Sequence, residues 1–219
     1  MSIQIAIDGP SGSGKSTVAK ILAKRLGFVH IDTGGMYRAV ALYAAEQGVD
    51  WDDGDAVCDI LRTIEIEIQY TAEGQRIVLN GQDVTALVRT AEMGVGASKV
   101  SAYPAVREKL VTMQREMASG RDVVMDGRDV GTVVLKNAAV KIFLVADAAV
   151  RARRRCAELE TLGLPWDYNK IFEQIEKRDF DDSNREFSPL TKADGAVEID
   201  AGDLDAEGVA ARIMEIAGL

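Results

Sequence analysis

The stretch IAIDGPSGSGKST, residues 5–17, decides the fold. An apolar run ends in Asp8 and gives way to glycines, a proline and small hydroxylic residues, before a lysine opens a sequence of helical character. The spacing from Gly9 to Gly14 and Lys15 fits the pattern G-x-x-x-x-G-K-[ST], a loop that binds phosphate. Bare glycine backbone lets N–H groups converge on phosphate oxygens, and the positive end of the following helix adds to the attraction.

The chemistry of this loop predicts roles for its members. Lys15 is expected to reach the β- and γ-phosphates of a nucleoside triphosphate, and the Ser16 hydroxyl to ligate Mg²⁺ directly. The residues expected to bind the triphosphate here are Gly9, Pro10, Ser11, Gly12, Ser13, Gly14, Lys15, Ser16 and Thr17. A Gly/Ser-rich linker would lack a strand before it and an amphipathic helix after it. Both are indicated here, by the apolar alternation over 3–7 and the helical spacing over 18–26.

Composition limits the class of protein. The 219 residues, 47% hydrophobic and 28% charged, suffice for one sizeable globular core with inserted subdomains. No run of eighteen apolar residues occurs, so we expect no membrane span, and no signal peptide is expected. The net charge of -9 disfavours nucleic-acid binding. Cys58 and Cys156 lack metal-ligand spacing and suit a reducing compartment. We expect a cytoplasmic monomer that acts on small molecules.

The chain has one histidine, His30, which makes Ser-His-Asp chemistry and a His-rich metal site improbable. It lies in a short strand pattern and is interpreted as a core or strand-end residue. Phosphoryl transfer needs no histidine, because catalysis there is mostly positioning and neutralisation of charge by lysine, arginine and metal.

Strand-like and helix-like runs alternate along the chain, which predicts a parallel sheet covered by helices on both faces, with ligands at the carboxyl ends of the strands. The expected strands are 3–7, 28–31, 122–126, 140–145 and 196–199. The expected helices are 15–26, 36–46, 104–118, 148–160, 168–178 and 206–216.

Two segments interrupt this alternation. Residues 64–70 alternate strictly between apolar and polar, and a Gly74 turn, the run 76–79 and an Asn80-Gly81 turn follow. This pattern predicts a small antiparallel hairpin sheet inserted into the core. The second segment, 151–185, is dense in arginine and is expected to form two helices and a mobile polar segment.

Polar residues follow two of the other expected strands. Thr33 and Arg38 bracket a glycine turn after the second strand, where a hydroxyl and a guanidinium could hold a second phosphate. Asp126 ends the third strand, the usual place for a carboxylate that orients Mg²⁺ through water. Of the later arginines, some of those over 151–155 are expected on a solvated helix face. The arginines of 178–185 are expected in a loop beyond a helix, where their planar forks suit phosphate.

Five segments occur together in this chain: IDGPSGSGKST, DTGGMYR, SKVSAYPAVRE, DGRDVGTVV, and RD-x-x-D-x-x-R followed by Pro189-Leu190. In this combination they resemble the bacterial cytidylate kinases. The resemblance spans nearly the whole chain, including the hairpin insert. The phosphate loop is shared with many NTPases, whereas the insert, SKVSAYPAVRE and GRD-x-GTVV are specific. Gly35 and Ala201 depart from the commoner alanine and hydroxyl residue, and neither is a proposed ligand.

The resemblance implies a P-loop NTPase fold: a three-layer α/β/α core with a five-stranded parallel sheet, an antiparallel β acceptor-binding insert and a helical lid. The implied core is 1–33, 100–150 and 188–219, the nucleoside-monophosphate domain 34–99 and the lid 151–187. The implied reaction transfers the γ-phosphoryl group of ATP to CMP or dCMP with Mg²⁺.

The resemblance also implies the site residues. Thr33, Arg38 and Arg128 would hold the CMP phosphate, and Arg178 and Asp182 the sugar or phosphate. Cytosine would be read by Ser98, Arg107 and Arg185; Asp129 matches a family site position without an assigned contact, and Arg154 would contact ATP. The implied catalytic residues are Lys15, Arg128, Arg178 and Arg185.

Two alternatives stay open at this point. A GTPase-type switch would use Thr191-Lys192-Ala193-Asp194 as a guanine-reading motif, but no strand is expected before it. A kinase for UMP, AMP or a small metabolite such as shikimate would share the phosphate loop, although a metabolite kinase needs no insert of this size.

Overall fold

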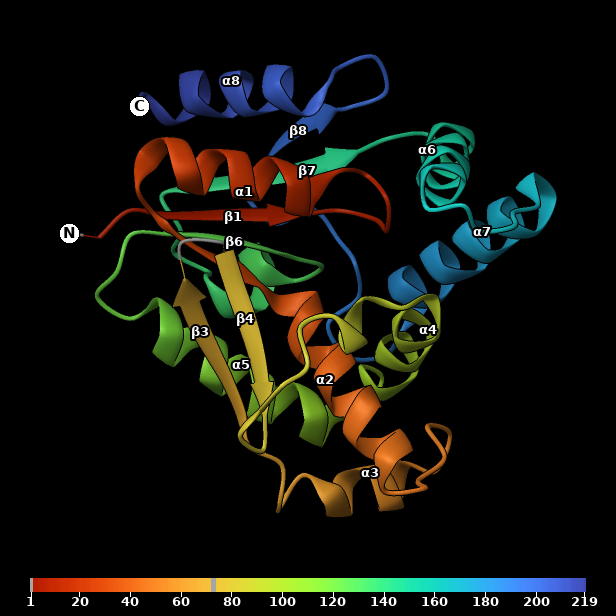
Figure 1. Cartoon of the computed structure of the whole chain (residues 1–219). Coiled ribbons are helices and arrows are strands. Elements are labelled where there is room, and N and C mark those ends of the chain that lie inside the picture. Colours follow the sequence, from red (N-terminus) through yellow and green to blue (C-terminus); the bar gives the residue numbers. More distant parts are fainter. Residues whose placement is uncertain (1, 72–73) are drawn as a thin grey trace.

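The structure is a computed structural model that describes residues 2–71 and 74–219. Its centre is a parallel sheet of five strands in the order β2-β6-β1-β7-β8 (Figure 1). The strands are β1 (Gln4–Asp8), β2 (Val29–Asp32), β6 (Val123–Gly127), β7 (Val140–Val145) and β8 (Val197–Asp200). The predicted sheet is confirmed. Several strands end one residue later than their apolar runs, because backbone pairing continues through Asp8 opposite Gly127 and through Asp32 opposite Asp126.

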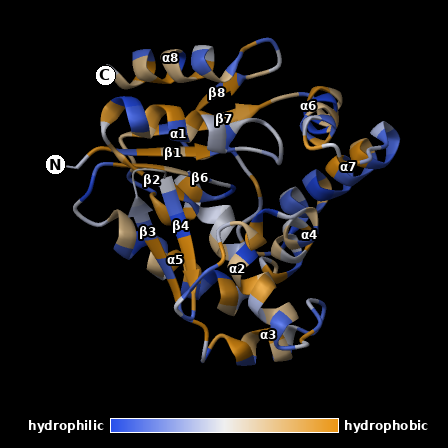
Figure 2. Ribbon diagram, viewed as in Figure 1, coloured by the Kyte–Doolittle hydropathy of each residue, from blue (hydrophilic) through white to orange (hydrophobic). Residues whose placement is uncertain are grey.

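Helices cover both faces of the sheet. Ile5 and Ile7 of β1 pack on the face that carries α1 (Lys15–Leu26) and α8 (Ala206–Ala217). Ala6 and Met125 point to the opposite face, which is covered by α5 (Pro104–Ala118) and a single π-helical turn, η2 (Val130–Val134). Because side chains alternate along a strand, successive residues of the same strand supply the two halves of the core in turn. Figure 2 shows β1 and β7 as mostly hydrophobic strands.

The hairpin predicted as an insert forms a second sheet, in the order β3-β4-β5. It is antiparallel, as predicted, and packs against α2 over a separate apolar core. Its strands are β3 (Ile66–Thr71), β4 (Gly74–Leu79) and β5 (Gln82–Asp83), followed by the 3-10 turn η1 (Leu87–Arg89). Gly74, where the turn is predicted, is the first residue of β4 and pairs with Thr71 at the end of β3, and residues 72–73 between them lie outside the described residues.

The helices around this sheet are α2 (Thr33–Glu46), α3 (Gly54–Ile60) and α4 (Ala91–Val100). The last two were not expected from the sequence. Helix α2 begins three residues before its predicted start, because the Asp32 side chain accepts a hydrogen bond from the Gly35 N–H at 3.1 Å and caps it.

Helices α6 (Ala148–Thr161) and α7 (Tyr168–Asn184) extend to one side of the sheet (Figure 1). They are joined by a small apolar seam that includes Ala152, Cys156 and Ile171. The prediction of a loop over 178–185 was wrong, since α7 continues to Asn184. Its last turns carry charged residues at helical spacing and therefore lack the apolar periodicity that predicts a helix. Among the described residues, no helix has the length and apolarity needed to cross a membrane.

Candidate active site

The phosphate loop lies at the carboxyl edge of the sheet, between β1 and α1. A Cβ at Gly9 would lie 2.0 Å from the carbonyl oxygen of Leu144, so only glycine fits there. Gly12 and Gly14 have φ of 76° and 97°, which glycine adopts without strain. The Lys15 ammonium is buried and donates to the Pro10 carbonyl at 2.6 Å. Burial and the charge of Arg128 hold the pKa of Lys15 well below its usual value.

Asp126, at the end of β6, joins three segments of the chain. One carboxylate oxygen accepts from the Ser16 hydroxyl at 2.6 Å, and the other lies 2.8 Å from His30 Nε2. Its backbone carbonyl accepts from the Thr33 hydroxyl at 2.8 Å. Burial opposes ionisation of Asp126, but the hydrogen bonds from His30 and Ser16 outweigh it, and its pKa lies below the usual value. The structure therefore brings both predicted Mg²⁺ ligands together.

The second phosphate position predicted from the sequence lies beside Asp126. Arg38 is partly buried on α2, and its pKa is lowered by burial, which the nearby Asp32 carboxylate opposes. Asp32 itself has a raised pKa, because it is buried and close to the charge of Asp126. Thr33 is buried and its hydroxyl hydrogen is already donated to Asp126. A phosphate at this position would therefore meet Arg38 as its cation.

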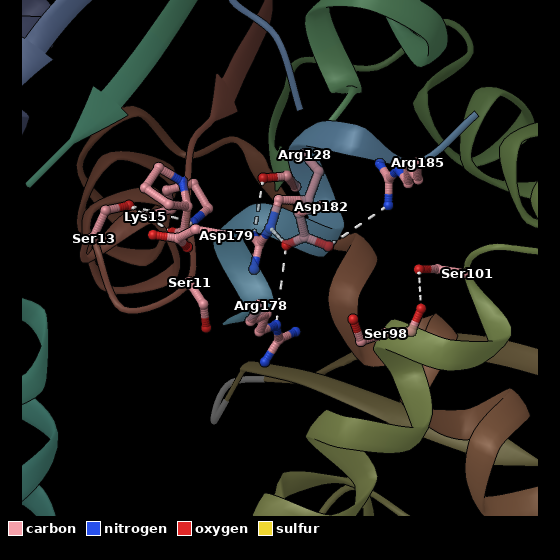
Figure 3. Close-up of polar contacts among 12 residues, drawn as sticks. Ser11, Ser13, Lys15, Ser98, Ser101, Arg128, Arg178, Asp179, Asp182 and Arg185 are labelled. Atoms are coloured by element: carbon pink, nitrogen blue, oxygen red, sulfur yellow. Dashed lines mark hydrogen bonds and ion pairs between the residues drawn. The ribbon is translucent and has the colours of Figure 1, made fainter. Parts of the chain in front are cut away.

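Three arginines surround Asp182 near the end of α7 (Figure 3). Arg128 donates through Nε to Asp182 at 2.8 Å, while Arg185 and Arg178 have nitrogens 3.8 and 4.0 Å from the same carboxylate. Burial raises the pKa of Asp182, but the three cations outweigh that effect and hold it below the usual value. Burial and the charge of Arg128 lower the pKa of Arg178 to about 10. Positive charge thus exceeds negative charge in this cluster.

A second buried pair lies next to the cluster. Arg107 on α5 donates to the Asp129 carboxylate and, at 3.2 Å, to the Ser101 carbonyl. Its guanidinium carbon is 5.3 Å from the centre of the Tyr37 ring, a cation–π distance. Asp129, for which no contact could be assigned from the sequence, is the partner of Arg107. Figure 3 shows Ser98 on α4, across from Arg178 on α7 and from Arg185, which directly follows α7.

Arg154 on α6 donates to the Ala201 and Gly202 carbonyls, which directly follow β8 at the carboxyl edge of the sheet. Its contact with ATP stays a prediction. The other predicted residues gather at the carboxyl edge or on the segments that face it. Two hollows, of about 400 Å³ between β8 and α8 and about 360 Å³ beside Arg115 and Leu135, contain none of them.

The structure adds residues that sequence reasoning missed. His30 is an active-site neighbour through Asp126 rather than a plain core residue. Asp8 accepts from the Val130 and Gly131 N–H groups at 2.8 and 2.7 Å and so holds the turn that follows Arg128 and Asp129. The position of Asp8, a carboxylate at the end of a buried strand, is the signal by which it could have been found from the sequence. Arg151, grouped in the sequence with arginines of a solvated face, is buried.

Solved structures with related architecture have low sequence identity to this chain. A shikimate kinase from Bacteroides thetaiotaomicron aligns with a TM-score of 0.50 and 15% identity over 99% of both chains. An uncharacterized protein from Eubacterium ventriosum aligns with a TM-score of 0.53, also at 15% identity over 99% of both chains. At this identity the likeness supports the fold alone.

Sequence comparison is more specific. A cytidylate kinase of Geobacillus thermodenitrificans is 51% identical over 214 residues, which are 98% of this chain and 96% of the relative. A cytidylate kinase of Lactobacillus gasseri is 48% identical over 98% of this chain and 93% of the relative. The sequence model of the family described as cytidylate kinase matches residues 5–218. The chain therefore belongs to the cytidylate kinase family.

Proposed function

We propose that the residues gathered at the carboxyl edge perform the reaction of this family with the roles given below. As a family member, the protein is a nucleoside-monophosphate kinase that phosphorylates CMP with ATP. In the proposed arrangement, ATP lies on the Gly9–Gly14 loop and CMP or dCMP between α2, α4 and α7. The terminal phosphoryl group passes from ATP to an oxygen of the CMP phosphate, giving ADP and CDP or dCDP.

One observation carries the residue assignment. Arg107 Nε, Arg178 Nε and Arg185 Nη2 are buried and have no hydrogen-bond acceptor among the described residues. A buried donor without an acceptor costs about 1–3 kcal/mol, and more when the group is charged. An anionic ligand with further acceptors would satisfy all three. Phosphate, ribose and cytosine together supply those acceptors, so a nucleotide matches this cluster better than a neutral metabolite does.

The donor set at Asp126 fits Mg²⁺. Ser16 and Asp126 present hard oxygen ligands 2.6 Å apart, and the lowered pKa keeps Asp126 ionised. Ser16 would bind the ion directly and Asp126 through water. When bound, the ion would neutralise charge on the transferred phosphoryl group. His30 orients the Asp126 carboxylate for that role.

The pair of Arg107 and Asp129 supports a preference for cytosine. Cytosine offers acceptors at O2 and N3 and a donor at N4, which match a guanidinium beside a carboxylate. Uracil has a donor at N3, and an arginine cannot accept from it. UMP would therefore leave an N–H facing a guanidinium in a closed site, and the cost corresponds to about 5- to 150-fold in kcat/KM.

The test is an assay of ATP consumption against CMP, dCMP, UMP and AMP. We expect CMP to exceed UMP by that factor, and R107M and R185M to narrow the gap by losing activity on CMP. R62M, which replaces an arginine whose side chain is 82% exposed, is the control and should keep the preference. Equal use of UMP and CMP by the unmodified enzyme, or full discrimination in both variants, would contradict the assignment.

The remaining alternatives have less support. Thr191-Lys192-Ala193-Asp194 lies in irregular chain before β8 rather than after a strand, which disfavours a guanine-reading motif.

Cys58 and Cys156 are free thiols, in keeping with the predicted reducing compartment. A monomer in the cytoplasm stays a prediction.

A further inference from the structure

Arg151, at the start of α6, connects three parts of the molecule. Its Nε donates to the Ala146 carbonyl at 2.8 Å, and its Nη1 donates to the Ser11 carbonyl of the phosphate loop at 3.1 Å. Both terminal nitrogens also donate to Asp179 of α7, at 3.1 and 2.5 Å, in a bidentate pair. The Arg151 side chain is 5% exposed. One guanidinium therefore fastens the phosphate loop to α7.

The position of Asp179 on α7 explains how the pair links the phosphate loop to the seam between α6 and α7. Ile171, Ile175 and Asp179 follow one another at four-residue spacing, so they lie on the same face of α7. The two isoleucines belong to the apolar seam against α6, and Asp179 adds a charged end to that seam beside the phosphate loop. A Cβ at Gly12 would lie 3.4 Å from Arg151 Cβ, which shows how closely the loop approaches α6.

Packing alone does not require a charged pair here. Apolar residues of similar volume hold two helices together as well as a buried ion pair does, and frequently better. What apolar residues cannot do is donate to a loop carbonyl. Asp179 also directly follows Arg178, and Asp182 lies one turn further along. Figure 3 shows Asp179 on the side of α7 toward the phosphate loop, with the Asp182 cluster next to it.

We infer that Arg151 and Asp179 are positioning residues that couple the two nucleotide sites. Through Arg151, the conformation that the loop takes around ATP sets the placement of α7, and α7 carries the arginines proposed to hold CMP. The coupling is reciprocal, so CMP also strengthens the binding of ATP. Arg151 acts through its contacts with Ser11 and Asp179 rather than by contact with the reacting groups. The inference rests on the proposed function for the identity of the two ligands.

The experiment measures CMP affinity by calorimetry, with Mg²⁺, in the absence and presence of saturating AMP-PNP. The readout is the ratio of the two dissociation constants, which a purely structural role would leave unchanged. We expect a ratio above about 5 in the unmodified enzyme, the lower end of typical couplings between sites. R151K and D179N should bring the ratio close to 1, since neither retains the bidentate pair, while CMP affinity without AMP-PNP changes little.

Two further variants keep the result decisive. D181N changes an exposed carboxylate on the same helix and should retain the full ratio. The double variant R151M/D179L restores apolar packing, so it should recover thermal stability lost in D179N and still show a ratio near 1. Recovery of the ratio together with stability would overturn the inference, as would a ratio near 1 in the unmodified enzyme. Failure of CMP to bind any of these proteins would instead refute the proposed function.

Discussion

Lys15 shows how a single residue is held ready for a ligand. It is buried against the carbonyl of Pro10, and burial lowers its pKa well below the usual value. A charge in that position is costly to bury, so it contributes little to the stability of the fold. Its contribution lies in neutralising charge on the transferred group.

We therefore expect Lys15→Met to lower kcat by about 10²- to 10³-fold, as the loss of comparable charge contacts does. Its melting temperature should be unchanged or higher. Lys20→Met, on the exposed side of the same helix, provides the control and should leave kcat unchanged. Steady-state kinetics and thermal unfolding decide the matter, and near-normal turnover of Lys15→Met would refute the assignment of the donor site.

The titration of one further residue, Asp8, makes the stability of the fold depend on pH. Burial raises its pKa to about 6, although two backbone N–H groups oppose that shift. A raised pKa means that the folded state binds the proton more tightly, so this stabilisation is complete below about pH 4 and is lost as the pH rises through 6. The amplitude is about 3 kcal/mol, from about 1.4 kcal/mol for each pKa unit.

Asp8→Asn removes this titration. The free energy of unfolding of the unmodified protein, minus that of Asp8→Asn, should fall between pH 4 and pH 6 and be flat above pH 7. Urea unfolding at a series of pH values measures it. A difference that does not vary over this range would show that Asp8 keeps an ordinary pKa.

At the scale of elements, the last turns of α7 depend on contacts with another part of the chain. Asp182 receives Arg128 from the turn after β6 and lies between Arg178 and Arg185. Removal of one partner from a buried ion pair is costly because the other charge is left uncompensated.

We expect Asp182→Asn to destabilise the fold by about 3 kcal/mol and to raise the KM for CMP. Added CMP should recover more stability in this variant than in the unmodified protein, since its phosphate supplies the missing negative charge. Thermal unfolding with and without CMP measures both effects. Asp181→Asn should behave as the unmodified protein, and an unchanged melting temperature for Asp182→Asn would contradict the role of this carboxylate.

The same elements show where sequence reasoning reached its limit. Helices α1 and α5 and strand β7 begin and end as predicted, because an apolar face and end signals mark them. The end of α7, with the sequence RDFDDSNR, has no such face, and its helical form depends on Arg128 from a distant segment. The contact between His30 and Asp126 likewise depends on β2 lying beside β6, which a local pattern does not reveal. Site residues in motifs could be predicted, whereas the ion pairs among them could not.

At the scale of the whole molecule, α6 and α7 are joined to each other more than to the sheet. Their shared seam is small, and Arg128, from the turn after β6, holds Asp182 of α7 through a charged rather than an apolar contact. A charged contact of this kind exchanges readily for contacts with a ligand. This supports the predicted lid over residues 151–187.

Hydrogen exchange tests the lid. Amides of residues 151–187 should exchange more slowly when both CMP and AMP-PNP are bound, because closure excludes water from the site. Amides of β1 and β6 in the core should exchange at the same rate with and without the nucleotides. Equal protection of 151–187 in the free and doubly bound protein would show that no lid closes.

The strand order has a consequence for how the protein is made. Strand β1 pairs with β6 and β7, whose residues lie more than a hundred positions later in the chain. Gly9 also passes against the Leu144 carbonyl. The phosphate loop therefore leaves the ribosome well before the strands that support it, which are complete only when the chain reaches Val145. Such long-range pairing slows folding, and ATP cannot act as a template for the early chain.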